Sequence, residues 1–277
     1  MDDPARQQPA TLARKPAPAS TLSPPAQRGR SRDAAASSAP PPAPPPAQPL
    51  GDDVVVLLLV ELKPAAWLWG WSRIVLRDRP LRRVRGVRFA KALGSGHGGG
   101  FGLRPSGSRQ GLFTVFANEA DADAFITTST LVEGYRARSR ELCIAKLRAT
   151  SSRGHWSGES ISVTAEPRAD GPVASLTRAS IRPRSAFAFW RRSPQTELAL
   201  QAAPGCRLAV GLGEAPLLRQ ATFSVWDDQA AMDAYARSGA HQDAICAAQH
   251  EHYFSESMFV RFAPLQITGT WHGQRHG

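Results

Sequence analysis

The chain of 277 residues is poor in cysteine and has no long apolar segment. Cys143, Cys206 and Cys246 are too few and too widely spaced for a disulfide framework or a zinc knuckle. This usage is typical of a reducing compartment, so we expect a cytoplasmic protein, with peripheral contact at the inner membrane kept open. The longest purely apolar run is Val54–Val60, whereas a membrane-spanning helix needs about 20 such residues. The sequence therefore excludes a span of the bilayer.

The sequence also lacks the residue patterns of common hydrolases. It has no Gly-x-Ser-x-Gly motif, no paired carboxylates in an apolar context and no cysteine close to a base. A glycine-rich segment, Gly94–Gly102, lies between two expected strands rather than between a strand and a helix. It is therefore neither a phosphate-binding loop nor a dinucleotide fingerprint. Two readings stay open for it, a flexible hairpin loop and a lid over a ligand pocket.

The first fifty residues contain almost no large apolar side chain. They hold 13 of the 23 prolines and 12 alanines, including the run PPPAPPPAQP. Such a segment buries too little apolar surface to offset the entropy lost on ordering. It also lacks the apolar stretch of a secretory signal. We therefore expect residues 1–51 to form a disordered Pro/Ala-rich head and the folded part to begin at residue 52.

The chain is basic, with a formal net charge of +11. Much of this charge lies in Arg73–Lys91, where seven arginines and one lysine stand against Asp78 alone. No nucleic-acid-binding motif accompanies the basic run, so nucleic acid is not an expected partner. A solvated face, an anionic membrane and an acidic protein partner remain open for this segment.

An internal repeat is the strongest signal in the sequence. The segment FTVFANEADADAF at 113–125 aligns without gaps to FSVWDDQAAMDAY at 223–235, with five identical positions. Other landmarks follow in the same order. They are Lys63-Pro64 with Trp71 against Arg182-Pro183 with Trp190, Leu93–Gly96 against Val210–Gly213, and Gly154–Gly158 against Gly269–Gly273. We therefore expect two copies of one unit, at 52–165 and 166–277.

Each copy has the pattern β-α-β-β-α-β, which is typical of a ferredoxin-like unit. In the first copy we expect a strand at Val54–Leu62, a helix at Trp67–Leu76, and strands at Val87–Leu93 and Leu112–Ala117. Asn118 is the expected N-cap of the helix that follows, and Asp227 or Asp228 serves in the second copy. One such unit covers only one face of its sheet. The sequence thus predicts an α+β fold in which two tandem ferredoxin-like repeats form a pseudo-dimeric α+β barrel.

The repeat alignment isolates His241, which stands where the first copy has Leu131. On a helix the neighbours of His241 on the same face are Ile245 and Ala248, both apolar. An imidazole on an apolar helical face is either a hydrogen-bonded structural histidine or an axial ligand of haem iron. Nothing else in the sequence chooses between the two.

Three tryptophans crowd the expected first helix. Trp67, Trp69 and Trp71 are spaced by two residues, so they cannot share one helical face and at least one must be exposed. Core filling, pocket lining and contact with a membrane interface are all open to them.

Residues 54–273 resemble the spheroidene monooxygenase family, the acyclic-carotenoid 2-ketolases of purple phototrophic bacteria. The resembling stretches are KALGSGHGGGF, RGHWSG, PVASLTRASIRPR with FWRR, VGLGEAPLLRQATFSVWDDQAAMDAYARSG, and the segment from His241 to Phe262. The resemblance implies haem as cofactor and His241 as its axial ligand. It also implies oxidation at C2 of spheroidene, through a 2-hydroxy product to a ketone, with O2 and electrons from a ferredoxin-type donor. The long head, His97, His250 and His252 depart from the family pattern.

Three alternatives remain beside this expectation. A barrel with the same histidine and pocket could be a non-catalytic haem or pigment carrier. A cofactor-free oxygenase of the same fold would need an electron-rich substrate. Cys206 and Cys246 stay as minor alternatives for the iron ligand, because thiolate ligation favours cleavage of the O–O bond more than histidine does.

Overall fold

The computed structural model describes residues 51–100, 104–168, 170–215, 217–237, 239, 242 and 252–277. They belong to the second of the two units into which the chain divides, Ala47–Gly277. The expected head and three of the residues singled out above, His241, Cys246 and His250, lie outside the described residues.

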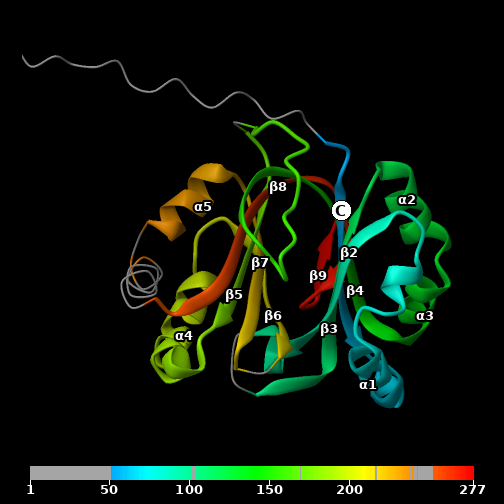
Figure 1. Ribbon diagram of the computed structural model, residues 1–277, viewed down its shortest axis with the longest axis horizontal. Helices are drawn as coiled ribbons and strands as arrows, with labels where there is room; N and C mark the ends of the chain where they lie inside the picture. Colours follow the sequence, from blue (N-terminus) through cyan, green and yellow to red (C-terminus); the bar gives the residue numbers. More distant parts are fainter. Residues whose placement is uncertain are drawn as a thin grey trace, which may run out of the picture. The chain divides into compact units, whose positions relative to one another are not determined.

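Eight antiparallel strands close into a barrel, and helices pack on its outside (Figure 1). The order around the barrel is β4-β1-β3-β2-β6-β7-β5-β8, and β8 pairs with β4 to close it. The strands are β1 (Val54–Leu62), β2 (Val87–Gly96), β3 (Pro105–Phe116), β4 (Ser139–Gly154), β5 (Val173–Ile181), β6 (Cys206–Ala215), β7 (Arg219–Trp226) and β8 (Phe254–Trp271), with the short β9 (Gln274–His276) paired to the end of β8. The helices are α1 (Trp67–Leu76), α2 (Glu119–Thr128), α3 (Thr130–Arg138), α4 (Ala186–Gln201) and α5 (Gln229–Ala236). The predicted α+β barrel is therefore confirmed.

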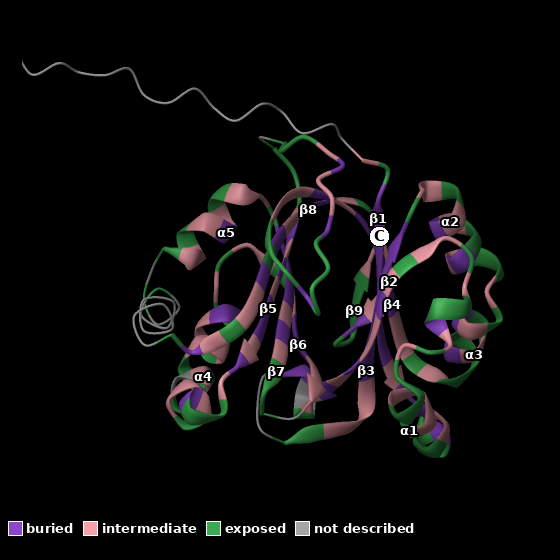
Figure 2. Ribbon diagram, viewed as in Figure 1, coloured by how far each residue is buried: buried purple, intermediate pink, exposed green. Residues whose placement is uncertain are grey.

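The strand β1 shows why the barrel needs a continuous apolar run. Successive side chains of a strand point to opposite faces. Val55, Leu57 and Leu59 enter the core inside the barrel, while the alternate residues from Val54 to Leu62 pack under the helices. Since neither face of β1 meets water, both sets are apolar. Figure 2 shows the resulting pattern, with buried strands and helices exposed on their outer sides.

The two halves of the barrel have the same order of elements and matching registers. In the first half β1 pairs with β3 from Val54↔Phe116, and in the second β5 pairs with β7 from Val173↔Trp226. Phe116 and Trp226 are the residues that the sequence alignment matched. The origin of the halves in a tandem repeat, and the boundaries 52–165 and 166–277, stay predictions.

Two unequal seams join the halves. The seam β4–β8 extends from Cys143↔Gly269 to Gly154↔Met258, with register shifts after Lys146 and after Ala149. The seam β2–β6 consists of two residue pairs, Gly94↔Gly213 and Ser95↔Leu212. The Ser95 hydroxyl strengthens it by donating a hydrogen bond of 2.7 Å to the carbonyl oxygen of Gly211.

The predicted helix starts are confirmed. The side chain of Asn118 accepts a hydrogen bond of 2.8 Å from the backbone N–H of Asp121, and Asp228 accepts one of 2.8 Å from Ala231. Asp228, rather than Asp227, is thus the cap of the second copy. These side chains satisfy N–H groups that have no partner in the first turn of a helix.

The described part of the glycine-rich segment, residues 94–100, continues the pairing of two strands. β2 continues to Gly96 and β3 begins at Pro105, so that only a short 3-10 turn at His97–Gly99 and the residues after it connect them. Strand pairing extends into the segment because Gly94 pairs with Gln110 and Gly96 with Pro105. A glycine in a strand weakens it but does not prevent backbone pairing.

Candidate functional site

The first candidate region is the space between the helices and the sheet, which differs between the two halves. In the first half, Val56, Leu58 and Val60 are fully buried under α2 and α3. Leu131, which the sequence aligned with His241, is partly buried in the same apolar cluster. Large apolar side chains thus fill the layer between sheet and helices in the first half.

In the second half, the equivalent positions hold small side chains. Counting from the matched pairs Val54↔Phe116 and Val173↔Trp226, the residues that correspond to Val56, Leu58 and Val60 are Ser175, Thr177 and Ala179. Ser175 and Thr177 remain partly exposed. Their partners on β7 are Ser224 and Thr222, which are equally small. The described side chains therefore fill this second layer much less than the first.

The residues predicted as iron ligands are only partly placed. His241 and Cys246 lie outside the described residues. Cys206 is half-buried, and burial raises the pKa of its thiol to about 11. Since the thiolate is the form that binds metals, this environment disfavours Cys206 as a ligand. His97 and His252, which depart from the family pattern, are exposed. Within the described ranges, no three His, Cys, Asp or Glu residues gather as a metal site.

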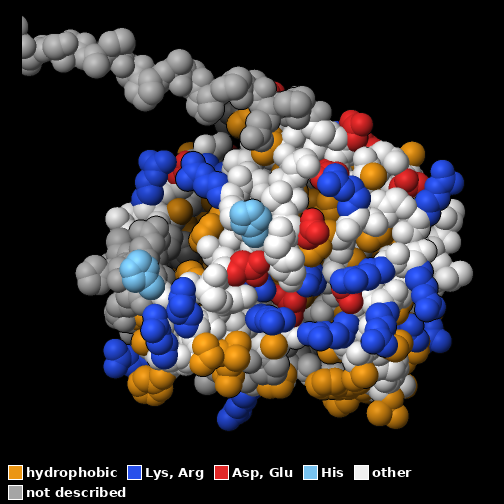
Figure 3. Space-filling view, viewed as in Figure 1, with side chains coloured by type: hydrophobic (Ala, Val, Ile, Leu, Met, Phe, Trp, Pro, Cys, Tyr) orange, Lys and Arg blue, Asp and Glu red, His pale blue; other side chains and the backbone are white. Residues whose placement is uncertain are grey.

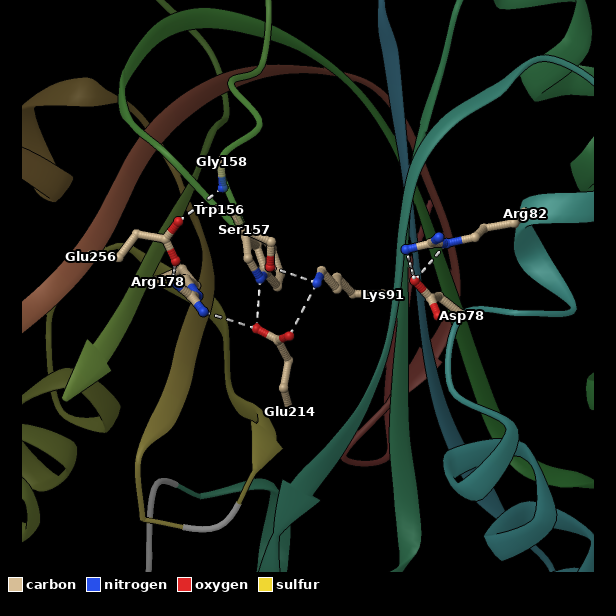
Figure 4. A network of polar contacts seen from close by, with 9 residues as sticks. All are labelled: Asp78, Arg82, Lys91, Trp156, Ser157, Gly158, Arg178, Glu214 and Glu256. Atoms are coloured by element: carbon tan, nitrogen blue, oxygen red, sulfur yellow. Dashed lines mark hydrogen bonds and ion pairs between the residues drawn. The ribbon is translucent and has the colours of Figure 1, made fainter. Parts of the chain in front are cut away.

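The second candidate region is a group of charged side chains inside the barrel (Figure 4). Glu214 of β6 accepts a hydrogen bond of 2.6 Å from the indole Nε1 of Trp156. It also forms ion pairs with Nη2 of Arg178, at 3.1 Å, and with Nζ of Lys91, at 3.2 Å. Arg178 is 2% exposed and binds Glu256 with its other terminal nitrogen. The group joins strands of both halves across the barrel.

The surroundings of Glu214 keep its carboxylate ionised. Burial acts to raise the pKa of Glu214, but the hydrogen bond from Trp156 and the charges of Lys91 and Arg178 outweigh it, so the pKa lies below its ordinary value. An ionised carboxylate with three donors cannot act as a proton donor near neutral pH. The group is therefore suited to fix Trp156 and the segment around it rather than to transfer protons.

A second aromatic and cationic pair lies on the first-half side of the barrel. The guanidinium of Arg109 lies 5.5 Å from the ring centre of Trp271 and donates two hydrogen bonds to Glu61. Trp271 is the residue that the repeat matched with Trp156, whose ring lies 5.7 Å from Arg178. Unlike Trp156, Trp271 has no hydrogen-bond partner for its buried Nε1 within the described chain.

A pocket of about 160 Å³ opens beside these charges. Trp71 and Ile74 of α1, Trp190 of α4 and Leu217 form its apolar part. The polar part is formed by Arg109, Gln110, Glu214 and Gln220, and the rest by Leu212 and by small residues in or next to β2, β3 and β6. An apolar wall with a few polar groups is the usual composition of a small-molecule site. Trp71 and Trp190, which the repeat alignment matched, thus line one pocket.

A larger hollow of about 530 Å³ lies near β9. Three arginines, Arg136, Arg140 and Arg275, line it together with residues of β4, β8 and β9. An apolar ligand there would remove water from these charges without replacing it, which is costly. The hollow is therefore less suited to an apolar substrate than the tryptophan-lined pocket.

The sequence did not reveal the charged group inside the barrel. Its members come from β2, β5, β6 and β8, and no spacing along the chain brings them together. One signal was available. Arg178 follows Ala174 and Leu176 at the alternate positions of β5 that face the barrel interior, so a charge there needed a buried partner.

The fold and the site define a class, a closed α+β barrel with an aromatic-lined pocket, and solved structures of this class exist. An aldoxime dehydratase has a TM-score of 0.51 at 12% identity, covering 78% of this chain and 82% of that chain. A second aldoxime dehydratase, in complex with butyraldoxime, has a TM-score of 0.50 at 10% identity, covering 78% and 80%. At these identities the likeness concerns the fold alone.

Proteins related to this chain in sequence are more similar to it than these solved structures are. A spheroidene monooxygenase of Rubrivivax gelatinosus is 60% identical over 227 residues, which are 82% of this chain and 88% of the relative. That of Rhodobacter capsulatus is 37% identical over 210 residues, or 74% and 87%. No family model matches the sequence. The chain belongs to the spheroidene monooxygenase family and is an oxygenase, as its resemblance to the family predicted.

Proposed function

We propose that this protein is a haem-dependent monooxygenase that oxidises C2 of acyclic carotenoids, taking spheroidene to 2-hydroxy and 2-keto products with O2 and electrons from a ferredoxin-type donor. The observation behind the substrate is the 60% identity to a spheroidene monooxygenase over most of both chains. A carotenoid is almost wholly apolar, in agreement with the tryptophans that line the pocket.

The second layer fits a haem better than the first. Ser175, Thr177 and Ala179 occupy little of the space that Val56, Leu58 and Val60 occupy in the first half. Leu131, which the repeat alignment matches with His241, contributes to the first layer. His241 would hold the iron, and the small side chains of β5 and β7 would leave room for the cofactor. Haem, when bound, supplies the activation of O2 that amino-acid side chains do not provide.

The chain's own residues would bind and orient the substrate. Trp71, Ile74 and Trp190 offer apolar contact to one end of the carotenoid chain. Beyond them the ionised group of Glu214, Arg178 and Lys91 has its members paired with one another, so it needs no charge from the ligand. The tryptophan walls would also keep water from the substrate.

The pseudo-dimeric organisation supports different roles for the two layers. We infer that the two halves derive from one ferredoxin-like unit, each supplying half of the barrel. After such a duplication one layer is free to keep its apolar filling and stabilise the fold. The other layer can lose its large apolar side chains and bind a cofactor, as the exchange of Leu131 for His241 indicates.

The basic segment Arg73–Lys91 is proposed to dock the protein, which we place in the cytoplasm at the inner membrane. Several of its charges have internal partners, among them Arg82 with Asp78 and Lys91 with Glu214. The exposed arginines Arg79 and Arg83 have no such partner within the described chain. They are the side chains suited to an acidic electron donor or to anionic lipid. No described helix has the length and apolar character needed to cross a bilayer.

The replacement of His241 by Ala tests the proposal. The purified variant should lose or shift the Soret absorption and should form no ketone, while its far-UV circular dichroism stays native. His97→Ala and His252→Ala are the matched controls, because both histidines are exposed and should be dispensable. If His241→Ala keeps a native haem spectrum and turnover, the ligand lies elsewhere. A native protein that turns over without any Soret band would contradict the haem proposal itself.

A further inference from the structure

Exposed apolar side chains gather at one end of the barrel, on α1, α4 and the turn between β6 and β7. Leu68 and Val75 of α1 are 88% and 75% exposed, and Phe187 of α4 is 81% exposed. Leu217 and Leu218 add to them from the turn. Figure 3 shows hydrophobic side chains along the lower edge of the molecule, where Figure 1 places α1 and α4. We call this set the apolar end.

The apolar end is organised rather than scattered. Leu68, Trp71 and Val75 are spaced by three and four residues, so they share one face of α1. Trp67 and Trp71 are about half exposed, which confirms that the three tryptophans of this helix do not all enter the core. Trp69 is the one that packs inward, 4.8 Å from the ring of Tyr135. Exposed apolar side chains that share one face of a helix in this way often mark an interaction site.

Positive charge surrounds the apolar end. Exposed basic side chains in or next to these segments include Arg77, Arg184, Arg191 and Arg219. Within the described chain none of the four has an ion-pair partner. Of the nearby acids, Asp78 is paired with Arg82 at 2.7 Å, and Glu197 is half-buried against Gly100. The combination of apolar side chains, tryptophan and unpaired arginine complements an anionic bilayer surface.

The apolar end also surrounds the opening of the tryptophan-lined pocket. Trp71 lies both on the exposed face of α1 and in the pocket wall. Leu217 does the same from the turn, where its carbonyl oxygen accepts a hydrogen bond of 2.9 Å from Trp190. A surface that contacted lipid through the apolar end would therefore bring the pocket opening to the bilayer.

We propose that the apolar end docks on an anionic lipid bilayer and receives the apolar substrate directly from it. Leu68, Val75 and Phe187 enter the interfacial region, while Arg77 and Arg184 bind lipid phosphates. The substrate then passes into the pocket between Trp71 and Trp190 without crossing water. This proposal depends on the proposed function only for the identity of the substrate that enters the pocket.

Vesicle binding by the full chain tests the docking. The native protein should sediment with vesicles of phosphatidylglycerol and phosphatidylcholine, and binding should weaken as salt rises. The triple variant Leu68→Ser, Val75→Ser, Phe187→Ser should bind about 100-fold more weakly. The double variant Arg77→Ser, Arg184→Ser should lose about 30-fold on these vesicles and little on pure phosphatidylcholine.

Matched controls remove the same kinds of side chain elsewhere. Leu265→Ser takes away an exposed leucine of β8, and the double variant Arg153→Ser, Arg275→Ser takes away two exposed arginines. Both should bind vesicles within about twofold of the native protein. Equal losses in controls and test variants would mean that total charge or hydrophobicity, rather than the apolar end, governs binding.

Two further outcomes would overturn the proposal. One is native vesicle binding by the triple variant. The other is a native chain that is dimeric without lipid and a triple variant that is monomeric, which would make the apolar end a contact between copies. Turnover separates this inference from the proposed function. The triple variant should lose activity on carotenoid in vesicles and keep it on carotenoid in detergent. If the native protein shows no turnover in detergent, the proposed function is contradicted, but the result on vesicle binding still holds.

Discussion

Replacing Glu214 by Gln would remove one charge from the interior of the barrel while keeping the size of the side chain. The side chain of Glu214 is 7% exposed. Its carboxylate accepts a hydrogen bond of 2.6 Å from Trp156 and forms ion pairs with Arg178 at 3.1 Å and with Lys91 at 3.2 Å. Breaking a buried ion pair from one side costs about 3–5 kcal/mol. Arg178 keeps Glu256, and glutamine can still accept from Trp156, so we expect the lower end, about 3 kcal/mol. For a domain of this size that lowers Tm by about 6–12 °C.

The effect should depend on pH in a definite direction. The folded-state pKa of Glu214 lies below its ordinary value near 4.5, so its charge stabilises the folded state above that pH. The contribution disappears as the pH falls through the folded-state pKa. Thermal or urea unfolding of the native protein and of Glu214→Gln should therefore differ fully at pH 7 and converge in acid.

Glu119 provides the matched control. Its carboxylate is 41% exposed and is paired at 2.9 Å with Lys146 and with Arg148 on the outside of the barrel. Because Glu119 is partly exposed and Lys146 keeps Asp123 at 2.7 Å, we expect a loss of about 1 kcal/mol, so Glu119→Gln should lower Tm by a few degrees at most. If Glu214→Gln loses no more stability than Glu119→Gln at pH 7, the reasoning about the charged group inside the barrel is wrong.

Three further predictions concern the layer, the halves and the basic segment. Replacing Thr177 by Leu should fill the second layer and prevent haem uptake in a Soret titration without lowering Tm, whereas Thr177→Ser should bind normally. Expressed separately, 52–165 and 166–277 should self-associate in sedimentation experiments, because each exposes two unpaired strand edges; two monomeric folded halves would contradict the shared barrel. Replacing Arg79 and Arg83 by Ser should slow ferredoxin-driven turnover and reduce its dependence on salt, and an unchanged rate would leave them as solvated residues.

Local patterns predicted much of the fold. The run at Val54–Val60 predicted a strand buried on both faces, and Asn118 predicted a helix start, because both follow from forces within a few residues. The matched segments 113–125 and 223–235 predicted two similar halves, and their registers in the sheet agree. The closed barrel followed from the need to cover the open face of each sheet.

What the sequence did not predict depends on contacts between distant strands. Lys91 and Arg178 looked like ordinary charges of a basic chain, yet both meet Glu214 inside the barrel. The unequal layers became evident only when the registers set Thr177 opposite Thr222 and Leu58 opposite Leu112. The ligand role of His241 stays a prediction, since that residue lies outside the described part of the chain.

Because the two seams are unequal, the barrel should open locally at one of them first. Parting β4 from β8 would break a long ladder, whereas parting β2 from β6 breaks the two pairs of Gly94 and Ser95, the hydroxyl bond from Ser95 and the ion pair of Lys91 with Glu214. Local opening follows the least stable contact, so spontaneous widening begins at β2–β6. Gly94, Ser95 and Gly213 of this seam also line the tryptophan-walled pocket. A long, stiff polyene can therefore be accommodated by a small elastic parting of two strands, with the rest of the cylinder left intact.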